Sequence, residues 1–140
     1  MRNNGRALGL DYGHKRIGIA LSDPTLTIAS PLTTLESHNV FSKLLEIIDK
    51  YEVKVIVIGK PISMSGESNN SQLQKVEKFI GKLKTLIDIE VILWDERLST
   101  HASQRCVNEA KISRNKQKNI IDKVAASFIL QGWIDYIRKT

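Results

Sequence analysis

The order of apolar segments along the chain is the feature that most limits how it can fold. Residues 7–12 and 17–22 are apolar runs, and the connection between them, residues 13–16, has the length and the glycine of a β-hairpin. A further strand is expected over residues 28–35, where Pro31 favours an edge strand or a bulge because proline cannot donate to a sheet ladder. The N-terminal part of the chain therefore predicts an antiparallel meander of three strands.

Strands and helices alternate after this meander. Residues 53–58 are a β-branched run, which is typical of a strand covered on both faces, and residues 89–94 predict another buried strand. Residues 59–70 are polar and contain glycine, proline and serine, which predicts a loop. Apolar spacing and capping residues predict helices over residues 40–51, 71–86, about 99–110 and about 119–138. Because helices between strands act as crossovers, we expect an α/β fold with a central mixed five-stranded sheet, in which parallel strands extend the meander and helices flank the sheet. The whole chain, residues 1–140, is expected to form a single domain.

The composition agrees with a globular protein. It is 41% hydrophobic and 26% charged, and it has neither a signal-peptide pattern nor an apolar run of the roughly 20 residues that a membrane span needs, so we expect a cytoplasmic protein without a membrane partner. The single cysteine, Cys106, excludes an internal disulfide framework and a cysteine-rich zinc site. The histidines His14, His38 and His101 lie far apart in the sequence, which disfavours zinc further.

Three acidic positions stand where separate elements end or begin. Asp11 closes the first apolar run, Asp95 and Glu96 follow the strand expected at residues 89–94, and Asp122 opens the last expected helix. Adjacent strand residues point to opposite faces, so only one of Asp95 and Glu96 faces a shared site easily, and strand parity does not choose between them. If three carboxylates from these elements converge, they form a site for hard divalent cations.

Each of these acids also has a purely structural interpretation. Asp11 lies just before a glycine and suits a turn, whereas an acid such as Asp122 in a first helical turn is stabilised by the helix dipole by about 0.3–1 kcal/mol. Two observations favour a shared site instead. Asp11 has the strand parity of the small residues Ala7 and Gly9, which would leave room for a metal and a substrate, and two alanines soon after Asp122 would let its helix approach a sheet.

Phosphodiester hydrolysis is the reaction that such a site suits. It places negative charge on the attacking and leaving oxygens, and two divalent ions about 3.5–4 Å apart stabilise both charges and lower the pKa of the attacking water. Mg²⁺ prefers oxygen ligands and keeps several waters, so a few carboxylates suffice. The chain has no P-loop, no Gly-x-Gly-x-x-Gly turn and no nucleophile elbow, so the enzyme classes that depend on these motifs are unsupported.

The cations of the chain concentrate in one segment. The formal net charge of +6 favours a polyanionic partner, and the segment from residue 111 to residue 118 leads directly toward Asp122. Its four cations, with no acid between them, are Lys111, Arg114, Lys116 and Lys118. This pattern favours a phosphate-binding loop beside the acids, with a solvated loop as the alternative. Ser99 and Thr100 are most simply helix caps, and phosphate contact at the same helix N-terminus is the sharper alternative.

Four motifs, in this order along the chain, resemble one known family. They read Gly9-Leu10-Asp11-Tyr12-Gly13-His14-Lys15-Arg16-Ile17-Gly18-Ile19-Ala20 with Ser22-Asp23, then Gly59-x-Pro61 with Gly66, then Asp95-Glu96-Arg97-Leu98-Ser99-Thr100, and Asp122-x-x-Ala125-Ala126-x-x-Ile129-Leu130-Gln131. Over essentially its whole length the chain resembles the YqgF-type pre-16S ribosomal RNA nucleases, which are also described as Holliday junction resolvases.

The resemblance implies a ribonuclease H-like fold and nuclease chemistry that depends on Mg²⁺ or Mn²⁺, with two ions when substrate is bound. It implies that Asp11, Glu96 and Asp122 are the catalytic and metal-binding acids, which decides for Glu96 over Asp95. The candidate nucleic-acid contacts are cations and hydroxyls near these acids: Lys15, Arg16, Arg97, Ser99, Thr100, Lys111, Arg114, Lys116 and Lys118. Arg97 has a structural alternative, which is to pair with the acid that is left over.

Three functions follow as hypotheses. The leading one is an endonuclease that processes the 5′ end of pre-16S rRNA in ribosome biogenesis, with structured RNA and ribosomal precursor particles as partners and with a monomer or weak homodimer as its state. The first alternative is a resolvase for four-way DNA in recombination and repair, which needs two active sites on a dimer. Junction resolvases of this fold carry a second aspartate three residues after the last acid, where this chain has Ala125. The second alternative is a non-catalytic nucleic-acid-binding module.

Overall fold

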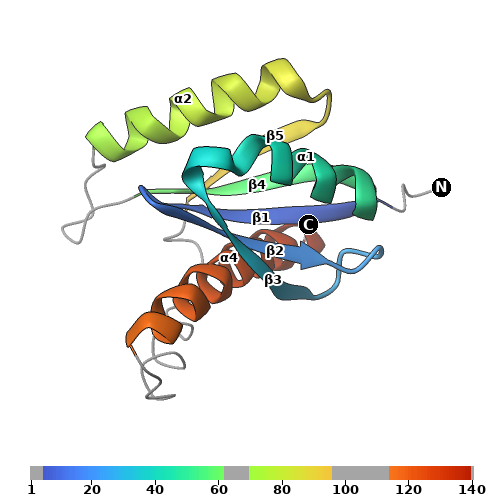
Figure 1. Cartoon of the computed structure of the whole chain (residues 1–140). Helices are drawn as coiled ribbons and strands as arrows, with labels where there is room; N and C mark the ends of the chain where they lie inside the picture. The colour runs from blue at the N-terminus through green and yellow to red at the C-terminus, as the bar shows by residue number, and fades with distance from the viewer. Residues whose placement is uncertain (1–4, 62–69, 96–113, 140) are drawn as a thin grey trace.

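The computed structural model describes residues 5–61, 70–95 and 114–139. A five-stranded sheet with the order β3-β2-β1-β4-β5 lies at its centre (Figure 1). The strands are β1 (Arg6–Tyr12), β2 (Arg16–Ser22), β3 (Ala29–Glu36), β4 (Val53–Lys60) and β5 (Glu90–Asp95). The first three pair antiparallel, and β4 and β5 extend the sheet parallel to β1. The prediction of a mixed sheet, in which parallel strands extend a meander, is confirmed.

Helices cover both faces of this sheet. On one face lie α1 (Val40–Tyr51), which follows the short 3-10 helix η1 (Ser37–Asn39), and α2 (Asn70–Leu86), whereas α4 (Arg114–Lys139) lies on the other face (Figure 1). The bounds of α1 are those predicted, and α2 begins one residue earlier than predicted. Within the described ranges, no helix combines the length and the apolar character that crossing a membrane requires.

The start of α4 differs from its prediction. The sequence predicts a start near residue 119, but the helix already includes Arg114, so the expected phosphate-binding loop is helical from residue 114 onward. Residues 114–119 are largely polar and lack the apolar period on which the prediction rests, yet arginine, lysine and glutamine favour helix. Asp122 consequently lies about two turns inside α4. Its interpretation as a first-turn residue is therefore wrong.

The two end strands of the sheet are β3 and β5. The register of β2 and β3 shifts beside Pro31, from Ile19 opposite Thr33 to Ala20 opposite Pro31. Pro31 thus lies both on an end strand and at a bulge, which confirms the prediction. The prediction of a buried strand is wrong for β5, whose Leu93 is 36% exposed. An apolar sequence of this kind also fits an end strand, because only tertiary structure decides how many neighbours a strand has.

Alternate strand residues supply two separate cores. Leu8 and Leu10 of β1 belong to the core under α1 and α2, whereas Ala7 belongs to the core under α4. The α4 core also contains the indole rings of Trp94 and Trp133. Successive side chains of a strand point to opposite faces, so once one residue of a strand is placed, the face of every other residue of that strand follows.

Two glycines allow α4 to lie directly on β1 and β2. A Cβ atom at Gly9 would lie 2.7 Å from the Cβ of Leu130 and 2.8 Å from the carbonyl oxygen of Ala126. A Cβ atom at Gly18 would lie 1.9 Å from the carbonyl oxygen of Asp122. Contacts under 3.0 Å essentially never occur for real Cβ atoms, so α4 keeps this position only while both residues are glycine.

The loop between β2 and β3 is fastened to α4 and closed by its own side chains. Gln131 accepts a hydrogen bond from the amide of Ala29 at 2.8 Å and donates one to the carbonyl of Thr27 at 3.1 Å. Asp23 accepts hydrogen bonds from the amides of Thr27 and Ile28 at 2.7 and 2.8 Å. These bonds, with the Ile28 amide as the largest cause, hold the pKa of the Asp23 carboxyl well below its usual value. Asp23 and Gln131, which belong to the quoted motifs, therefore have structural roles.

We expect Gly18→Ala to lower the free energy of unfolding by about 1–3 kcal/mol or more, because the added methyl group meets the backbone of Asp122 and the helix has to move. Gly81→Ala is the matched control. A Cβ at Gly81 meets nothing within 4 Å on α2, so this variant should gain about 0.5–1 kcal/mol from helix propensity. Urea unfolding of both variants measures the difference, and equal stabilities would contradict the close approach of α4.

Candidate metal centre and nucleic-acid interface

Asp11 faces α4 near the end of β1. Its neighbours Leu10 and Tyr12 pack on the opposite face, and strand residues alternate. The predicted parity with small residues holds, since Ala7 lies in the α4 core and Gly9 is in contact with α4. The helix α4 occupies the space beside Ala7 and Gly9. The expectation that these small residues leave room for a metal and a substrate is therefore wrong.

The helix α4 carries Asp122 to the same place. Asp11 is paired with Gly18 across the antiparallel ladder of β1 and β2. Such partners have Cα atoms about 4.5–5.5 Å apart and side chains on the same face. The backbone of Asp122 lies on Gly18, so the two aspartates occupy neighbouring positions on the α4 face of the sheet. The structure thus brings together two of the three predicted acids.

The end of β5 separates the two adjacent acids by face. Trp94 is buried in the α4 core, with its ring centroid 5.3 Å from that of Tyr136. Asp95 comes next and is in register with Lys60 of β4, so by alternation it belongs to the face of α1 and α2, opposite to that of Asp11. Glu96 lies outside the described residues. Among the residues that are described, no group of three or more acidic, histidine or cysteine side chains suits a metal ion.

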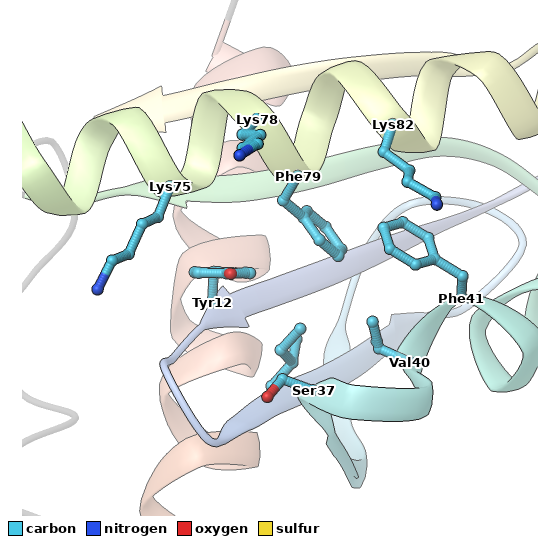
Figure 2. Close-up of a pocket in the computed structure, with 9 residues that line it drawn as sticks. Tyr12, Ser37, Val40, Phe41, Lys75, Lys78, Phe79 and Lys82 are labelled. Carbon is cyan, nitrogen blue, oxygen red and sulfur yellow. The ribbon is translucent and has the colours of Figure 1, made fainter.

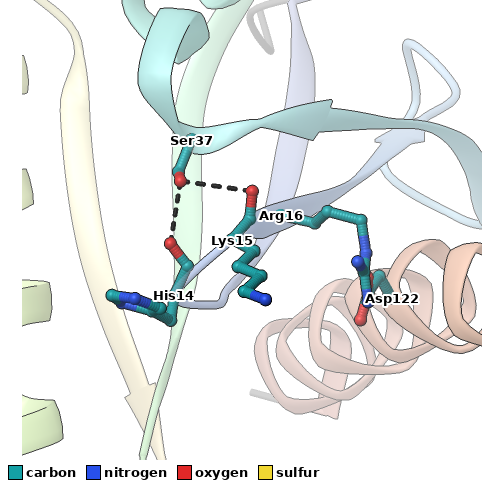
Figure 3. A network of polar contacts seen from close by, with 5 residues as sticks. All are labelled: His14, Lys15, Arg16, Ser37 and Asp122. Atoms are coloured by element: carbon teal, nitrogen blue, oxygen red, sulfur yellow. Dashed lines mark hydrogen bonds and ion pairs between the residues drawn. The ribbon is translucent and has the colours of Figure 1, made fainter.

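An ion pair joins the start of β2 to α4. The Nε–H of Arg16 donates to Oδ2 of Asp122 at 2.9 Å, and the two side chains are 33% and 22% exposed (Figure 3). The sequence presents Arg16 as a phosphate contact, and the structure gives it a partner in a candidate metal ligand. A guanidinium group has five N–H donors in a planar fork, so the same side chain can orient Asp122 and still meet a phosphate.

The β1–β2 hairpin is held by the residue that follows β3. The hydroxyl of Ser37 donates to the carbonyl oxygens of His14 and Lys15, at 2.8 and 3.2 Å, and the amide of Ser37 donates to Lys15 at 3.0 Å (Figure 3). The side chains of His14 and Lys15 are exposed. A fixed backbone therefore presents the cation of Lys15 to solvent, close along the chain to the Arg16–Asp122 pair.

Comparison with known sequences identifies the family. Residues 5–136 match the sequence model of the RuvX family, which is described as a Holliday junction resolvase. The chain belongs to the RuvX family. A protein of Clostridium kluyveri named "Putative pre-16S rRNA nuclease" is 44% identical over 137 residues, which cover 96% of this chain and 99% of that protein. A protein of the same name from Clostridium botulinum strain Hall is 45% identical over 138 residues, with the same coverage of 96% and 99%.

Solved structures agree on the fold of this RuvX-family chain. RuvC of Thermus thermophilus, in a complex with a Holliday junction substrate, superposes with a TM-score of 0.64 over 96% of each chain, at 8% sequence identity. A second structure of Thermus thermophilus RuvC has a TM-score of 0.58 and covers 96% of this chain and 97% of its own. At this identity the likeness concerns the fold alone. The predicted ribonuclease H-like fold, the family and the nuclease class are confirmed.

A basic groove lies beside the ion pair of the RuvX-family chain. It is a cavity of about 430 Å³ on the side of β3, and its cations are Arg16 and Lys123. Thr33, Thr34 and Glu36 supply its polar wall. Sequence reasoning missed Lys123, although it directly follows Asp122. The position of Lys123 next to a candidate acid was the sequence signal that could have found it. The orientation of α4 on the sheet decides whether Asp122 and Lys123 belong to one site.

The remaining predicted metal ligand and nucleic-acid contacts lie wholly or partly outside the residues that the structure describes. The whole helix expected over about residues 99–110 is outside the described residues, and so are Glu96, Arg97, Ser99, Thr100 and Lys111. Arg114, Lys116 and Lys118 lie in the first turns of α4, with their side chains outside the description. Asp11, Lys15, Arg16 and Asp122 are the predicted site residues whose side-chain surroundings the structure describes.

We expect Arg16→Ala to lower the free energy of unfolding by no more than about 1 kcal/mol, because both partners of the ion pair are partly exposed and water screens it. For a chain of this size that loss corresponds to a fall of roughly 3–5 °C in Tm. Arg138→Ala, which removes a cation on the far part of α4, serves as the control. Thermal unfolding measures both, and a loss of several kcal/mol for Arg16→Ala alone would mean that the pair holds α4 in place.

Proposed function

We propose that this chain is a divalent-metal-dependent endonuclease of the cytoplasm, which hydrolyses phosphodiester bonds in structured RNA and processes the 5′ end of pre-16S rRNA. The observation that carries the proposal is that Asp11 is paired with Gly18 and that the backbone of Asp122 lies on the same glycine, on one face of the sheet. The groove of Arg16 and Lys123 beside them supports a polyanionic substrate. The name of the two Clostridium relatives supports precursor ribosomal RNA as that substrate.

The donor set fits a hard divalent cation. Asp11 and Asp122 offer carboxylate oxygens from two different elements, which is what Mg²⁺ and Mn²⁺ prefer. We infer that these two residues and Glu96 hold the metal, with two ions in the presence of substrate. Bound ions would lower the pKa of the attacking water and stabilise the charge on the leaving oxygen.

Strand alternation supports Glu96 as the third acid. Asp95 belongs to the opposite face from Asp11, because it is in register with Lys60 and follows the buried Trp94. Of the two adjacent acids, Asp95 therefore does not share a face with Asp11, and we propose Glu96, which lies outside the described residues. The sequence alone leaves Asp95 and Glu96 equal in this respect, so the face of Trp94 adds an argument that is independent of the family motif.

The cations of the chain orient the acids and the substrate. Arg16 fixes one carboxylate oxygen of Asp122 by its Nε–H, which limits the rotation of that side chain before any substrate binds. Lys15 on the hairpin and Lys123 in the groove would neutralise phosphates on either side of the scissile bond. The other contacts that we propose are Arg97, Ser99, Thr100, Lys111, Arg114, Lys116 and Lys118.

Asp11→Asn should lower the rate of cleavage by at least about 100-fold while nucleic-acid binding stays intact or becomes tighter, because the amide replaces an anionic metal ligand without adding bulk. The measurement is cleavage of a labelled 5′ segment of pre-16S rRNA with Mg²⁺ or Mn²⁺, and with EDTA. Asp88→Asn is the matched control, since Asp88 is an exposed acid before β5 at the opposite end of the sheet. Retained turnover in purified Asp11→Asn would contradict the assignment, and salt-sensitive binding without any metal-dependent cleavage by the unmodified chain would favour a non-catalytic module.

Resolution of four-way DNA is the second candidate, because the matched family is described as a Holliday junction resolvase. Symmetric cutting of two strands needs two active sites, so this function predicts a dimer on the junction. Analytical ultracentrifugation with and without a synthetic junction, together with a cleavage assay on it, tests this. A chain that stays monomeric on the junction and leaves it uncut, while cleaving RNA, would exclude the second candidate.

A further inference from the structure

A second cavity lies on the face of the sheet opposite to the proposed metal centre. It has a volume of about 230 Å³ and opens between α2 and the start of α1 (Figure 2). Among the residues that the structure describes, its lining combines aromatic rings with lysines and contains no acid: Tyr12, Ile17, Ser37, Val40, Phe41, Lys75, Lys78, Phe79 and Lys82. Neither the proposed active site nor the quoted motifs account for this combination.

The floor of the cavity is a cluster of three aromatic rings. The centroid of the Phe79 ring lies 5.0 Å from that of Tyr12 and 5.2 Å from that of Phe41. Phe79 is buried between them and is explained by core packing, but Tyr12 and Phe41 are only partly buried and both line the cavity (Figure 2). Partly exposed rings of this kind are platforms on which nucleobases stack, whatever their sequence.

The rim of the cavity is a row of cations on one side of α2. Lys75, Lys78 and Lys82 follow one another at helical spacing, and all three are exposed. The ammonium group of Lys82 lies 5.5 Å from the centre of the Phe41 ring. Three cations beside aromatic rings, with no acid among the described lining residues, are complementary to a phosphate backbone that carries unpaired bases.

The cavity is continuous along the chain with the proposed active site. Tyr12 follows Asp11 directly, with its side chain on the opposite face of β1. Ser37 lines the cavity and also donates to the carbonyls of His14 and Lys15 in the hairpin. The hairpin therefore lies between the cavity and the Arg16–Asp122 ion pair. A single strand of nucleic acid that crosses the hairpin would contact the cavity and the ion pair.

We propose that this cavity, named here the lysine–aromatic pocket, binds an unpaired stretch of the nucleic-acid substrate next to the segment that enters the active site, with bases on Tyr12 and Phe41 and phosphates on the three lysines. This proposal rests on the proposed nuclease function. It adds a substrate class, which is a nucleic acid with a single-stranded segment beside the scissile bond. RNA and DNA strands share the chemistry that the pocket recognises.

The test measures binding in EDTA, so that it is independent of cleavage. Fluorescence anisotropy with a short single-stranded oligonucleotide is recorded over a series of salt concentrations for the variant Lys75→Gln, Lys78→Gln, Lys82→Gln. The slope of log affinity against log salt should fall by about 0.7 for each phosphate that the variant no longer neutralises. The control variant Lys50→Gln, Lys84→Gln, Lys139→Gln removes the same charge from exposed lysines outside the lining and should change the slope less.

A second variant tests the stacking of bases on the pocket. Phe41→Leu keeps an apolar side chain in the cluster but removes the ring, and single-strand affinity should fall roughly 5- to 150-fold if one base stacks there. Tyr136→Leu, a half-exposed aromatic residue on α4, is the control and should leave affinity unchanged. Thermal unfolding of both variants confirms that they are folded. Oligo-U and oligo-dT are compared in parallel, and the strand whose affinity falls more is the one that the pocket prefers.

The outcomes separate this inference from the proposed function. If the unmodified chain binds no nucleic acid, the proposed function itself fails. If the unmodified chain binds, but the pocket lysines and Phe41 behave like their controls, the lysine–aromatic pocket is not a nucleic-acid site. An equal fall in affinity for a blunt duplex and for a single strand would overturn the assignment to unpaired bases.

Discussion

The close packing of α4 on β1 and β2 is the contact on which the candidate site depends. At Gly9 and Gly18 the strands present no side chain to α4, so at these two positions the helix lies directly on the strand backbone. This contact carries Asp122 to the position beside Asp11, although the two residues are far apart in sequence. A longer side chain at either glycine would hold α4 away from the sheet and separate the acids.

The sheet divides the chemistry of the molecule between its two faces. The face of α4 carries the acids and the groove of Arg16 and Lys123, whereas the face of α1 and α2 carries the lysine–aromatic pocket. The hairpin after Asp11 lies at the edge where these faces meet, and Ser37 fixes its backbone. A flexible strand of nucleic acid is the kind of ligand that can contact both faces of a thin sheet at once.

Much of the fold follows from pattern. The alternation of β1 and β2, the β-branched β4 and the bounds of α1 are local signals, and Pro31 marks both an end strand and a bulge. The errors occurred where pattern carries no information about neighbours. The first turns of α4 have a polar sequence without an apolar period, although they are helical. The sequence of β5 predicts a buried strand, although β5 is an end strand with Leu93 exposed.

The sequence by itself determined the family, the mixed sheet and the candidate acids, because motif order and apolar periodicity are properties of the chain alone. Only the tertiary structure places the backbone of Asp122 beside the strand position of Asp11. The face of Trp94 assigns Asp95 to the side away from Asp11, and the ion pair of Arg16 with Asp122 joins positions 106 residues apart. Such contacts depend on how α4 crosses the strands, and no local pattern contains that angle. The physical reason is that parity fixes the relative faces within one strand, whereas the packing of helix on sheet fixes the faces of different elements relative to one another.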